Sequence, residues 1–354
     1  MIDIRKASAD ISILCKETGE EKKLREELNA FLEEWYSSSP LIALQTSGST
    51  GLPKTILAEK EKMRRSARLT LQTFCLSPGA TAFCAMSLSY IAAKMMVVRA
   101  IEGSLRLILS PPSSHPLAMD TIPDIDFAAM VPIQIEKSMQ NSLERERLSK
   151  IKTVIIGGTA IHPTLEEQLT QLPNSIYATY GMTETFSHVA IRRVNGKERS
   201  LSFTPLKGVS ISLSEKEAIT VNAPFLSDTP IVTNDRGILF PDGSFEILGR
   251  LDNVINSGGI KLQLEELEQR LLPIVPVPFL LTSAPHSLWG EVLVIVLEGE
   301  VELCELTNKI AEKLESKERP KYFETVSSLP KTENGKIVRR PYDNLFTLTP
   351  LSYE

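Results

Sequence analysis

Apolar positions in the first hundred residues recur at the spacing of helices. Between residues 20 and 36 they fall three or four positions apart, at Leu24, Leu28, Phe31 and Trp35. This period places them on one face of an amphipathic helix. Residues 59–76 repeat the helical pattern, and the mostly apolar stretch 89–103 predicts a third helix that closes at Gly103.

Short apolar runs alternate with such helical stretches up to about residue 185, and each run predicts a strand. These runs lie at residues 81–86, 105–110, 126–131, 152–156 and 175–181. Strands that alternate with helices indicate a largely parallel α/β layer, in which ligands bind at the strand ends. We therefore expect an α/β fold with layered sheets in a large N-terminal domain, residues 1–250.

From about residue 205 the pattern changes to short strands and hairpins, with Asp242-Gly243 as a turn signal. Beyond Arg250 come a helix, two apolar strands, a second helix and a last strand with its loop. This order predicts a small, mobile α+β domain over residues 251–354. The domain boundary is expected between Arg250 and Asp252.

Composition narrows the classes of function. A chain of 354 residues with 42% hydrophobic and 23% charged residues is that of a globular protein with room for two domains. Its net charge of −5 gives no electrostatic reason to expect nucleic acid. The four cysteines form no close pair, and the start shows no signal peptide, so we expect reduced thiols in a cytoplasmic protein. No apolar run reaches the ~18 residues of a membrane span, and the histidines lack metal spacing.

The segment "TSGSTGLPK", residues 46–54, concentrates hydroxyl groups, glycines and a lysine after the apolar run 41–44. Glycine-rich backbone and added donors make a concave anion site, which suits a phosphate chain. The spacing does not fit the common Gly-x4-Gly-Lys-Ser/Thr loop, because Pro53 stands where the second glycine would be. A phosphate loop of another design and a plain surface turn both remain open from these residues alone.

Several motifs occur in a fixed order. They are "TSGSTGLPK" at 46–54, "YGMTET" at 180–185, "TND" at 233–235, "LGRLDNVINSGGIK" at 248–261 and "PKTENGK" at 330–336. In this order they resemble the signatures of the adenylate-forming superfamily of acyl- and aryl-CoA synthetases, adenylation domains and luciferases. The stretches "YIAAKMMVVRA", "DFAAMVP" and "TYGMTETFSHVAIR" are similar to its o-succinylbenzoate–CoA ligase branch, which serves menaquinone biosynthesis.

The resemblance implies a two-step ligase that joins a carboxylic acid to AMP and then to CoA, with ATP, Mg²⁺ and CoA as its small-molecule partners. The residues implied to wrap the ATP phosphates are Thr46, Ser47, Ser49, Thr50, Gly51 and Lys54. Those implied around the adenine are Gly157, Gly158 and Tyr180, and Gly181 is implied in binding the nucleotide. Glu184 would hold Mg²⁺ with Thr183 nearby, Asp235 and Arg250 would hold the ribose, and Lys336 would reach the α-phosphate.

Each of these residues also has a plainer interpretation by itself. Glu184 can serve as a helix-start carboxylate, Tyr180 as a core residue, and Lys336 as a solvated turn lysine. The pattern of the superfamily more often has glycine where Asn234 precedes Asp235, which puts the local turn in question. Only the ordered set favours the functional interpretation.

The resemblance also implies a hinge at Asp252 and a path for the pantetheine arm of CoA along Gly258 and Gly259. For the second carboxylate of an o-succinylbenzoate substrate the candidates are Lys94, Ser187 and His188. Lys94 interrupts an apolar helix on the face of Tyr90, although a lysine there more often reaches for water.

One departure concerns the short region before the phosphate loop. Only 45 residues precede Thr46, whereas the superfamily usually has a longer region there. We expect one wall of the usual cleft to be missing, rebuilt or supplied by a partner subunit, which leaves a homo-oligomer open. Two other functions remain open: a stand-alone adenylation enzyme that loads a carrier protein, and a non-catalytic nucleotide-binding descendant. The tail after residue 340 is too short for a carrier domain.

Overall fold

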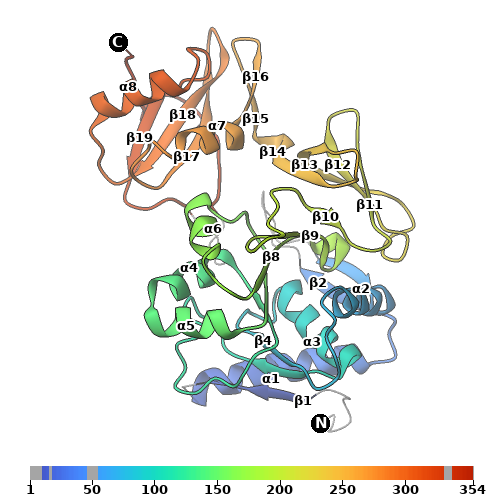
Figure 1. Cartoon of the computed structure of the whole chain (residues 1–354). Helices are drawn as coiled ribbons and strands as arrows, with labels where there is room; N and C mark the ends of the chain where they lie inside the picture. Colours follow the sequence, from blue (N-terminus) through green and yellow to red (C-terminus); the bar gives the residue numbers. More distant parts are fainter. Residues whose placement is uncertain (1–9, 16–17, 46–54, 331–336, 354) are drawn as a thin grey trace. The chain divides into compact units, whose positions relative to one another are not determined.

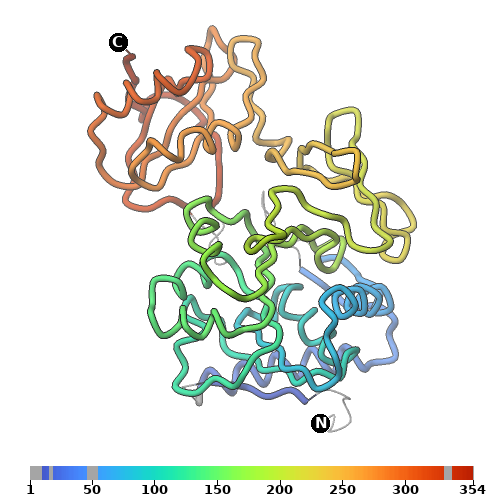
Figure 2. The backbone as a smooth tube through the Cα atoms, viewed as in Figure 1, coloured from blue at the N-terminus to red at the C-terminus, as the bar shows by residue number. Residues whose placement is uncertain are grey.

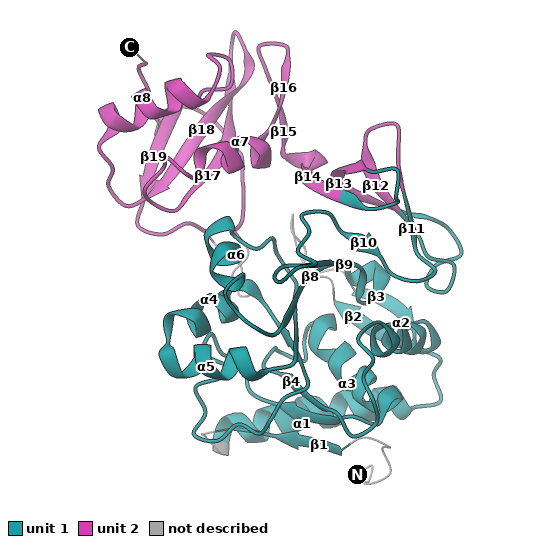
Figure 3. Ribbon diagram, viewed as in Figure 1, with its two compact units in different colours: residues 1–211, 221–231, 240–245 teal, residues 212–220, 232–239, 246–354 magenta. Residues whose placement is uncertain are grey.

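The computed structural model describes residues 10–15, 18–45, 55–330 and 337–353. The chain separates into two compact units (Figure 3). The first comprises residues 1–211, 221–231 and 240–245, and the second comprises residues 212–220, 232–239 and 246–354. Figure 2 traces the backbone through each of them.

The first unit is built on an eight-stranded sheet in the order β1-β5-β4-β6-β7-β8-β9-β10 (Figure 1). Its strands are β1 (Asp10–Ile13), β4 (Thr81–Cys84), β5 (Arg106–Leu109), β6 (Phe127–Met130), β7 (Thr153–Ile156), β8 (Ser175–Gly181), β9 (His188–Arg193) and β10 (Thr204–Pro205). The pairs from β1 to β8 are parallel, and β9 and β10 are antiparallel additions. The predicted α/β class is therefore confirmed, and the carboxyl ends of β7 and β8 lie side by side.

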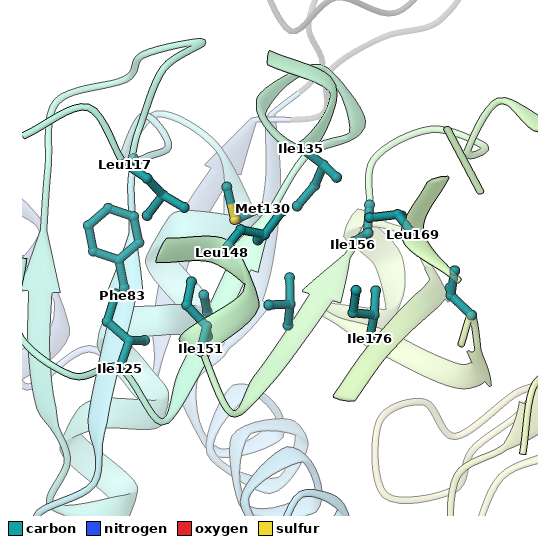
Figure 4. Close-up of a cluster of buried hydrophobic side chains, with 14 of the residues drawn as sticks. Phe83, Leu117, Ile125, Met130, Ile135, Leu148, Ile151, Ile156, Leu169 and Ile176 are labelled. Carbon is teal, nitrogen blue, oxygen red and sulfur yellow. The ribbon is translucent and has the colours of Figure 1, made fainter. Parts of the chain in front are cut away.

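Helices connect these strands. They are α1 (Thr18–Tyr36), α2 (Lys60–Thr73), α3 (Ile91–Gly103), α4 (Pro132–Gln140), α5 (Ser142–Lys150) and α6 (Pro163–Leu169). Figure 4 shows side chains of α4, α5 and α6, such as Ile135, Leu148 and Leu169, among those of the strands. Each fully buried side chain of this size contributes about 2 kcal/mol relative to an exposed one. Elsewhere in the unit α3 packs on β4, β5 and α2.

Helix α3 ends where the sequence predicts, but the residue that closes it is not the predicted one. Gly103 is the last helical residue, but Ser104 takes the left-handed conformation that closes the helix, at φ 49°. A Cβ on Gly103 would lie 2.7 Å from Leu71 Cδ2, so this glycine allows α2 and α3 to approach closely. The apolar run before the phosphate-type segment forms a hairpin of its own, β2 (Leu41–Gln45) with β3 (Thr55–Glu59), outside the large sheet.

The second unit holds most of a four-stranded sheet and all of a six-stranded sheet. The four strands are β11 (Ser210–Leu213), β12 (Ala218–Asn222), β13 (Ile231–Leu239) and β14 (Phe245–Arg250). The six are β15 (Val254–Ser257), β16 (Ile260–Gln263), β17 (Phe279–His286), β18 (Gly290–Glu298), β19 (Tyr322–Val326) and β20 (Thr349–Pro350). Helices α7 (Leu264–Leu271) and α8 (Leu303–Lys313) complete an apolar core with the six-stranded sheet. A functional boundary between residues 250 and 251 stays a prediction.

Candidate functional site

Seven of the predicted site residues lie outside the described part of the chain. They are Thr46, Ser47, Ser49, Thr50, Gly51, Lys54 and Lys336. The residues on either side of the phosphate-type segment, Gln45 and Thr55, are paired across the β2–β3 hairpin. The remaining candidates fall within one unit or the other.

Two of the adenine candidates follow β7. Gly157 and Gly158 come directly after that strand, and Gly158 has a φ of 98°, a conformation that favours glycine. A Cβ on Gly157 would lie 2.6 Å from Thr179 Oγ1 on β8, so glycine lets the two strand ends approach. The pair leaves bare backbone at the carboxyl edge of the sheet, and its contact with adenine stays a prediction.

Tyr180 and Gly181 end the neighbouring strand β8. The ring of Tyr180 is buried and lies 5.4 Å from that of Phe245 and 6.1 Å from that of Phe203. A Cβ on Gly181 would lie 2.4 Å from the Ser187 carbonyl oxygen, which explains the glycine by close backbone approach. The role of Tyr180 as an adenine platform stays a prediction, because its ring also has an aromatic cluster to pack in.

The turn after β8 holds the candidate magnesium ligand. A 3₁₀ turn, Thr183–Thr185, is closed by Thr185, whose Oγ1 accepts from Met182 N at 3.0 Å and lies 2.7 Å from the Ser187 carbonyl oxygen. Phe186 follows with a φ of 61°, which is unusual for a bulky residue and occurs at functional turns. The turn presents the side chain of Glu184 to solvent.

The chemistry of this turn fits Mg²⁺ held mainly by phosphate oxygens. Such an ion takes one or two carboxylates from the protein, while substrate phosphates and water complete its shell. Glu184 supplies one exposed carboxylate, with the half-buried Thr183 beside it. Across the described ranges no group of three or more His, Cys, Asp or Glu is arranged to hold a metal by itself.

The acyl candidates separate in space. Lys94 on α3 lies toward α1, with its Nζ 5.8 Å from the centroid of the Phe31 ring, and burial lowers its pKa. Ser187 and His188 lie where β9 begins, and Ser187 Oγ accepts a hydrogen bond from Nη2 of Arg99, which lies five positions after Lys94 on α3. Burial lowers the pKa of His188 to about 3, and the charge of Arg99 adds to this effect.

Arg99 is a candidate site residue that the sequence reasoning missed. Its side chain is only 2% exposed, and its Nε is buried without a hydrogen-bond partner in the described part of the chain. Burial lowers its pKa to about 10, and the interaction with Cys84 opposes that effect. The sequence does place an arginine inside the apolar run "MMVVRAI". A charged side chain is rarely fully buried unless it has a partner, and this could have indicated the residue.

The ribose candidates lie together in the second unit. Nη1 of Arg250, at the end of β14, is 3.6 Å from Oδ1 of Asp235 on β13. Its Nε and Nη2 donate to both oxygens of Asp252 at 3.0 and 3.1 Å, which raises the pKa of Arg250. Asp235 N donates to Thr233 Oγ1, and Asn234 does not take a positive φ, so the missing glycine leaves this strand intact.

The remaining candidates form a tight turn. Gly258 and Gly259 connect β15 to β16 with φ values of 57° and 82°, the conformation of a two-residue hairpin that favours glycine. Gly258 N donates to the Trp289 carbonyl oxygen at 2.9 Å. The turn accounts for both glycines, and their place on a CoA path stays a prediction.

The comparison with known proteins identifies the class. Residues 6–220 match the family of AMP-binding enzymes, and the chain belongs to this family. It is 32% identical to an acyl-CoA synthetase (AMP-forming)/AMP-acid ligase II-like protein from Dyadobacter fermentans, with a TM-score of 0.62, over 89% of this chain and 92% of that one. The resemblance inferred from the motifs is confirmed at this level.

Within the family the chain is similar to 2-succinylbenzoate–CoA ligases. It is 29% identical to the one from Lactococcus lactis over 54% of this chain, and 28% identical to the one from Escherichia coli K12 over 82%. The matches span 46% and 65% of those two relatives. Among the described helices, none is long and apolar enough to cross a membrane.

Proposed function

We propose that the chain is an ATP-dependent acid–CoA ligase that works through an acyl-adenylate, with o-succinylbenzoate as its acid. The observation that carries this proposal is the set of ordered motifs in a chain of the AMP-binding enzyme family. The geometry agrees with it, because Gly157, Gly158 and Glu184 all lie just beyond neighbouring strand ends. Ligands of parallel α/β sheets bind at such ends.

In the first step one oxygen of the substrate carboxylate attacks the α-phosphorus of ATP. The bond to the bridging oxygen breaks and pyrophosphate leaves with its electron pair. We assign the phosphate grip to Thr46, Ser47, Ser49, Thr50, Gly51 and Lys54. Lys336 would place its ammonium on the α-phosphate, where a fixed donor contributes about 3 kcal/mol to the transition state. Bound Mg²⁺ would neutralise the charge that gathers on the phosphates.

We assign the adenine to Gly157, Gly158, Tyr180 and Gly181. Asp235 and Arg250 would hold the ribose, since a carboxylate can accept from both hydroxyls of the diol. This assignment requires Arg250 to divide its guanidinium between the ligand and Asp252, which it now binds through Nε and Nη2.

In the second step the CoA thiol attacks the activated carbonyl, the thioester forms and AMP leaves. We assign the hinge between the steps to Asp252, between domains 1–250 and 251–354, and the pantetheine path to Gly258 and Gly259. Hinges of this kind need a few residues that absorb a change of φ and ψ. We place the reaction in the cytoplasm, where ATP and CoA are both present.

The acid is inferred from Arg99. An uncompensated guanidinium in a dry interior costs several kcal/mol, so such a group is retained where an anion arrives to pair with it. Its free Nε and the half-buried Ser187 beside it suit a carboxylate that is bound but not activated. The relatives named 2-succinylbenzoate–CoA ligase give the corresponding dicarboxylic acid.

An ATP–pyrophosphate exchange screen over aromatic and aliphatic acids tests this function. We expect Mg²⁺-dependent exchange that is fastest with o-succinylbenzoate, and thioester formation once CoA is added. Transfer of the acyl group to a carrier protein, with no thioester formed from CoA, would favour the carrier-loading enzyme. Absence of exchange with every acid, together with absence of ATP binding, would contradict both functions.

A further inference from the structure

A continuous line of polar groups runs through the interior of the first unit. It begins at Arg99 on α3, passes through Ser187 and His188 at the start of β9, and ends at Thr70 on α2. Ser187 Oγ lies 3.3 Å from His188 Nδ1, and His188 Nε2 lies 3.5 Å from Thr70 Oγ1. Thr70 Oγ1 donates to the Ser66 carbonyl oxygen at 3.3 Å. Arg99, His188 and Thr70 are at least nine-tenths buried.

Both ends of this line have a fixed hydrogen-bond direction. A guanidinium has no acceptor, so Ser187 Oγ must accept from Arg99. A carbonyl oxygen has no donor, so the hydroxyl hydrogen of Thr70 is committed to Ser66. The hydrogen of Ser187 is then available for His188 Nδ1, and Thr70 Oγ1 is available to accept from His188 Nε2.

His188 lies between these two hydroxyl groups, with one ring nitrogen facing each. The arrangement that uses the hydrogen of Ser187 and the free lone pair of Thr70 is a neutral His188 with its proton on Nε2 and a lone pair on Nδ1. The groups around it agree: the ring of Phe74, directly after α2, lies 6.0 Å away, edge to face, and Arg99 is the charged neighbour that acts on it. Cys84, on β4, is the titratable group next to Arg99, and burial raises its pKa to about 11, so it stays neutral.

We propose that His188, as the neutral Nε2–H tautomer, is a positioning residue that makes Ser187 present its oxygen to Arg99 and so aims the free Nε–H of Arg99 at the spare carboxylate of the acid. Thr70 positions His188 in the same way. This inference rests on the proposed function. It adds that selection for a second carboxylate depends on two buried residues that do not touch it.

The tautomer is tested on the whole chain without any substrate. Uniform ¹⁵N labelling of the histidines gives imidazole signals for His115, His162, His188 and His286, and His188→Asn identifies the one that disappears. We expect a neutral Nε2–H ring at pH 7 that is still neutral at pH 5. A proton on Nδ1, or an imidazolium at pH 7, would overturn the proposal even if the enzyme is a ligase.

Kinetics test the consequence with two matched pairs of variants, His188→Leu with His188→Asn and Thr70→Val with Thr70→Ser. The acids are o-succinylbenzoate and 3-benzoylpropionate, which lacks the ring carboxylate. In the leucine and valine variants we expect the KM for o-succinylbenzoate to rise about tenfold, the effect of one lost charge-linked hydrogen bond. The kcat and the KM for ATP should change less than twofold.

The asparagine and serine variants should restore most of the affinity, because each keeps the acceptor that its neighbour needs. An equal rise in the KM for both acids, or no rise in KM in either the leucine or the valine variant, would contradict the positioning role. If the wild-type protein catalyses ATP–pyrophosphate exchange with none of the acids, the proposed function has failed instead. The two failures are therefore distinguishable, and the ¹⁵N spectrum decides about His188 in either case.

Discussion

Replacing Arg99 by methionine should stabilise the protein while it removes the preference for a dicarboxylic acid. Methionine has a similar length and can occupy the same dry space without a charge. Burial lowers the pKa of the guanidinium from 12.5 to about 10. At about 1.4 kcal/mol per pH unit, this corresponds to about 3 kcal/mol against the charged form in the folded protein.

The sign follows from the direction of that shift. A base whose folded pKa is lowered carries its full cost below the folded pKa, and the cost disappears as the pH rises from about 10 toward 12.5. At neutral pH the whole cost is therefore present. The hydrogen bond to Ser187 returns about 2 kcal/mol of it, so Arg99→Met should raise the free energy of unfolding by about 1 kcal/mol.

Urea unfolding followed by tryptophan fluorescence measures this change. The chain has two tryptophans, and a Trp289→Phe background leaves Trp35, which is buried in the same unit as Arg99. In activity, Arg99→Met should lose at least about 30-fold in kcat/KM for o-succinylbenzoate and little for 3-benzoylpropionate. Arg99→Lys, which keeps the charge without the fork, should fall between. A loss of 2 kcal/mol or more in stability, with both acids equally affected, would refute the reasoning.

The other predictions concern separate parts of the site. Glu184→Gln should lower the rate of adenylate formation about 100-fold and raise the Mg²⁺ concentration needed for half-maximal rate; an unchanged Mg²⁺ dependence would remove Glu184 from the ion. Lys336→Ala should suppress adenylate formation to a similar degree but spare thioester formation from supplied acyl-adenylate, and equal loss in both half-reactions would count against its role. Asp235→Asn should raise the KM for ATP about tenfold, and an unchanged KM would exclude a ribose contact. Because burial lowers the pKa of His188 to about 3 from 6.5, the unfolded chain takes up the proton first as the pH falls, so the free energy of unfolding should drop by about 2 kcal/mol from this residue between pH 7 and pH 5. His188→Asn should remove that part of the pH dependence, and an unaltered dependence would show that folding does not lower the pKa of His188.

The helices of the first unit could be predicted because their signal is local. The apolar spacing predicted for residues 20–36 corresponds to α1, and the apolar runs at 152–156 and 175–181 correspond to β7 and β8. A period read within one window contains this information. The hairpin of β2 with β3 was not foreseen, because the partner of a strand is not encoded in its own pattern.

The polar line through Arg99 could not be predicted for a related reason. Arg99 and Ser187 are 88 positions apart in the sequence, and only the fold brings them together. Lys94 was the more visible cation because it breaks the apolar pattern earlier in the same helix. Five positions, about 1.4 turns of helix, separate the two residues, so their side chains leave the helix in different directions, Lys94 toward α1 and Arg99 toward β9.

The transfer of ¹⁸O from the acid to AMP tests the central claim most directly. The protein is incubated with ATP, Mg²⁺, CoA and o-succinylbenzoate whose carboxylates carry ¹⁸O. Mass spectrometry then measures the ¹⁸O content of the nucleotide product and of the thioester. An acyl-adenylate places one carboxylate oxygen between carbon and phosphorus, so AMP should gain a single ¹⁸O as the thioester forms. Unlabelled AMP alongside thioester, or ADP in place of AMP, would contradict a route through the adenylate.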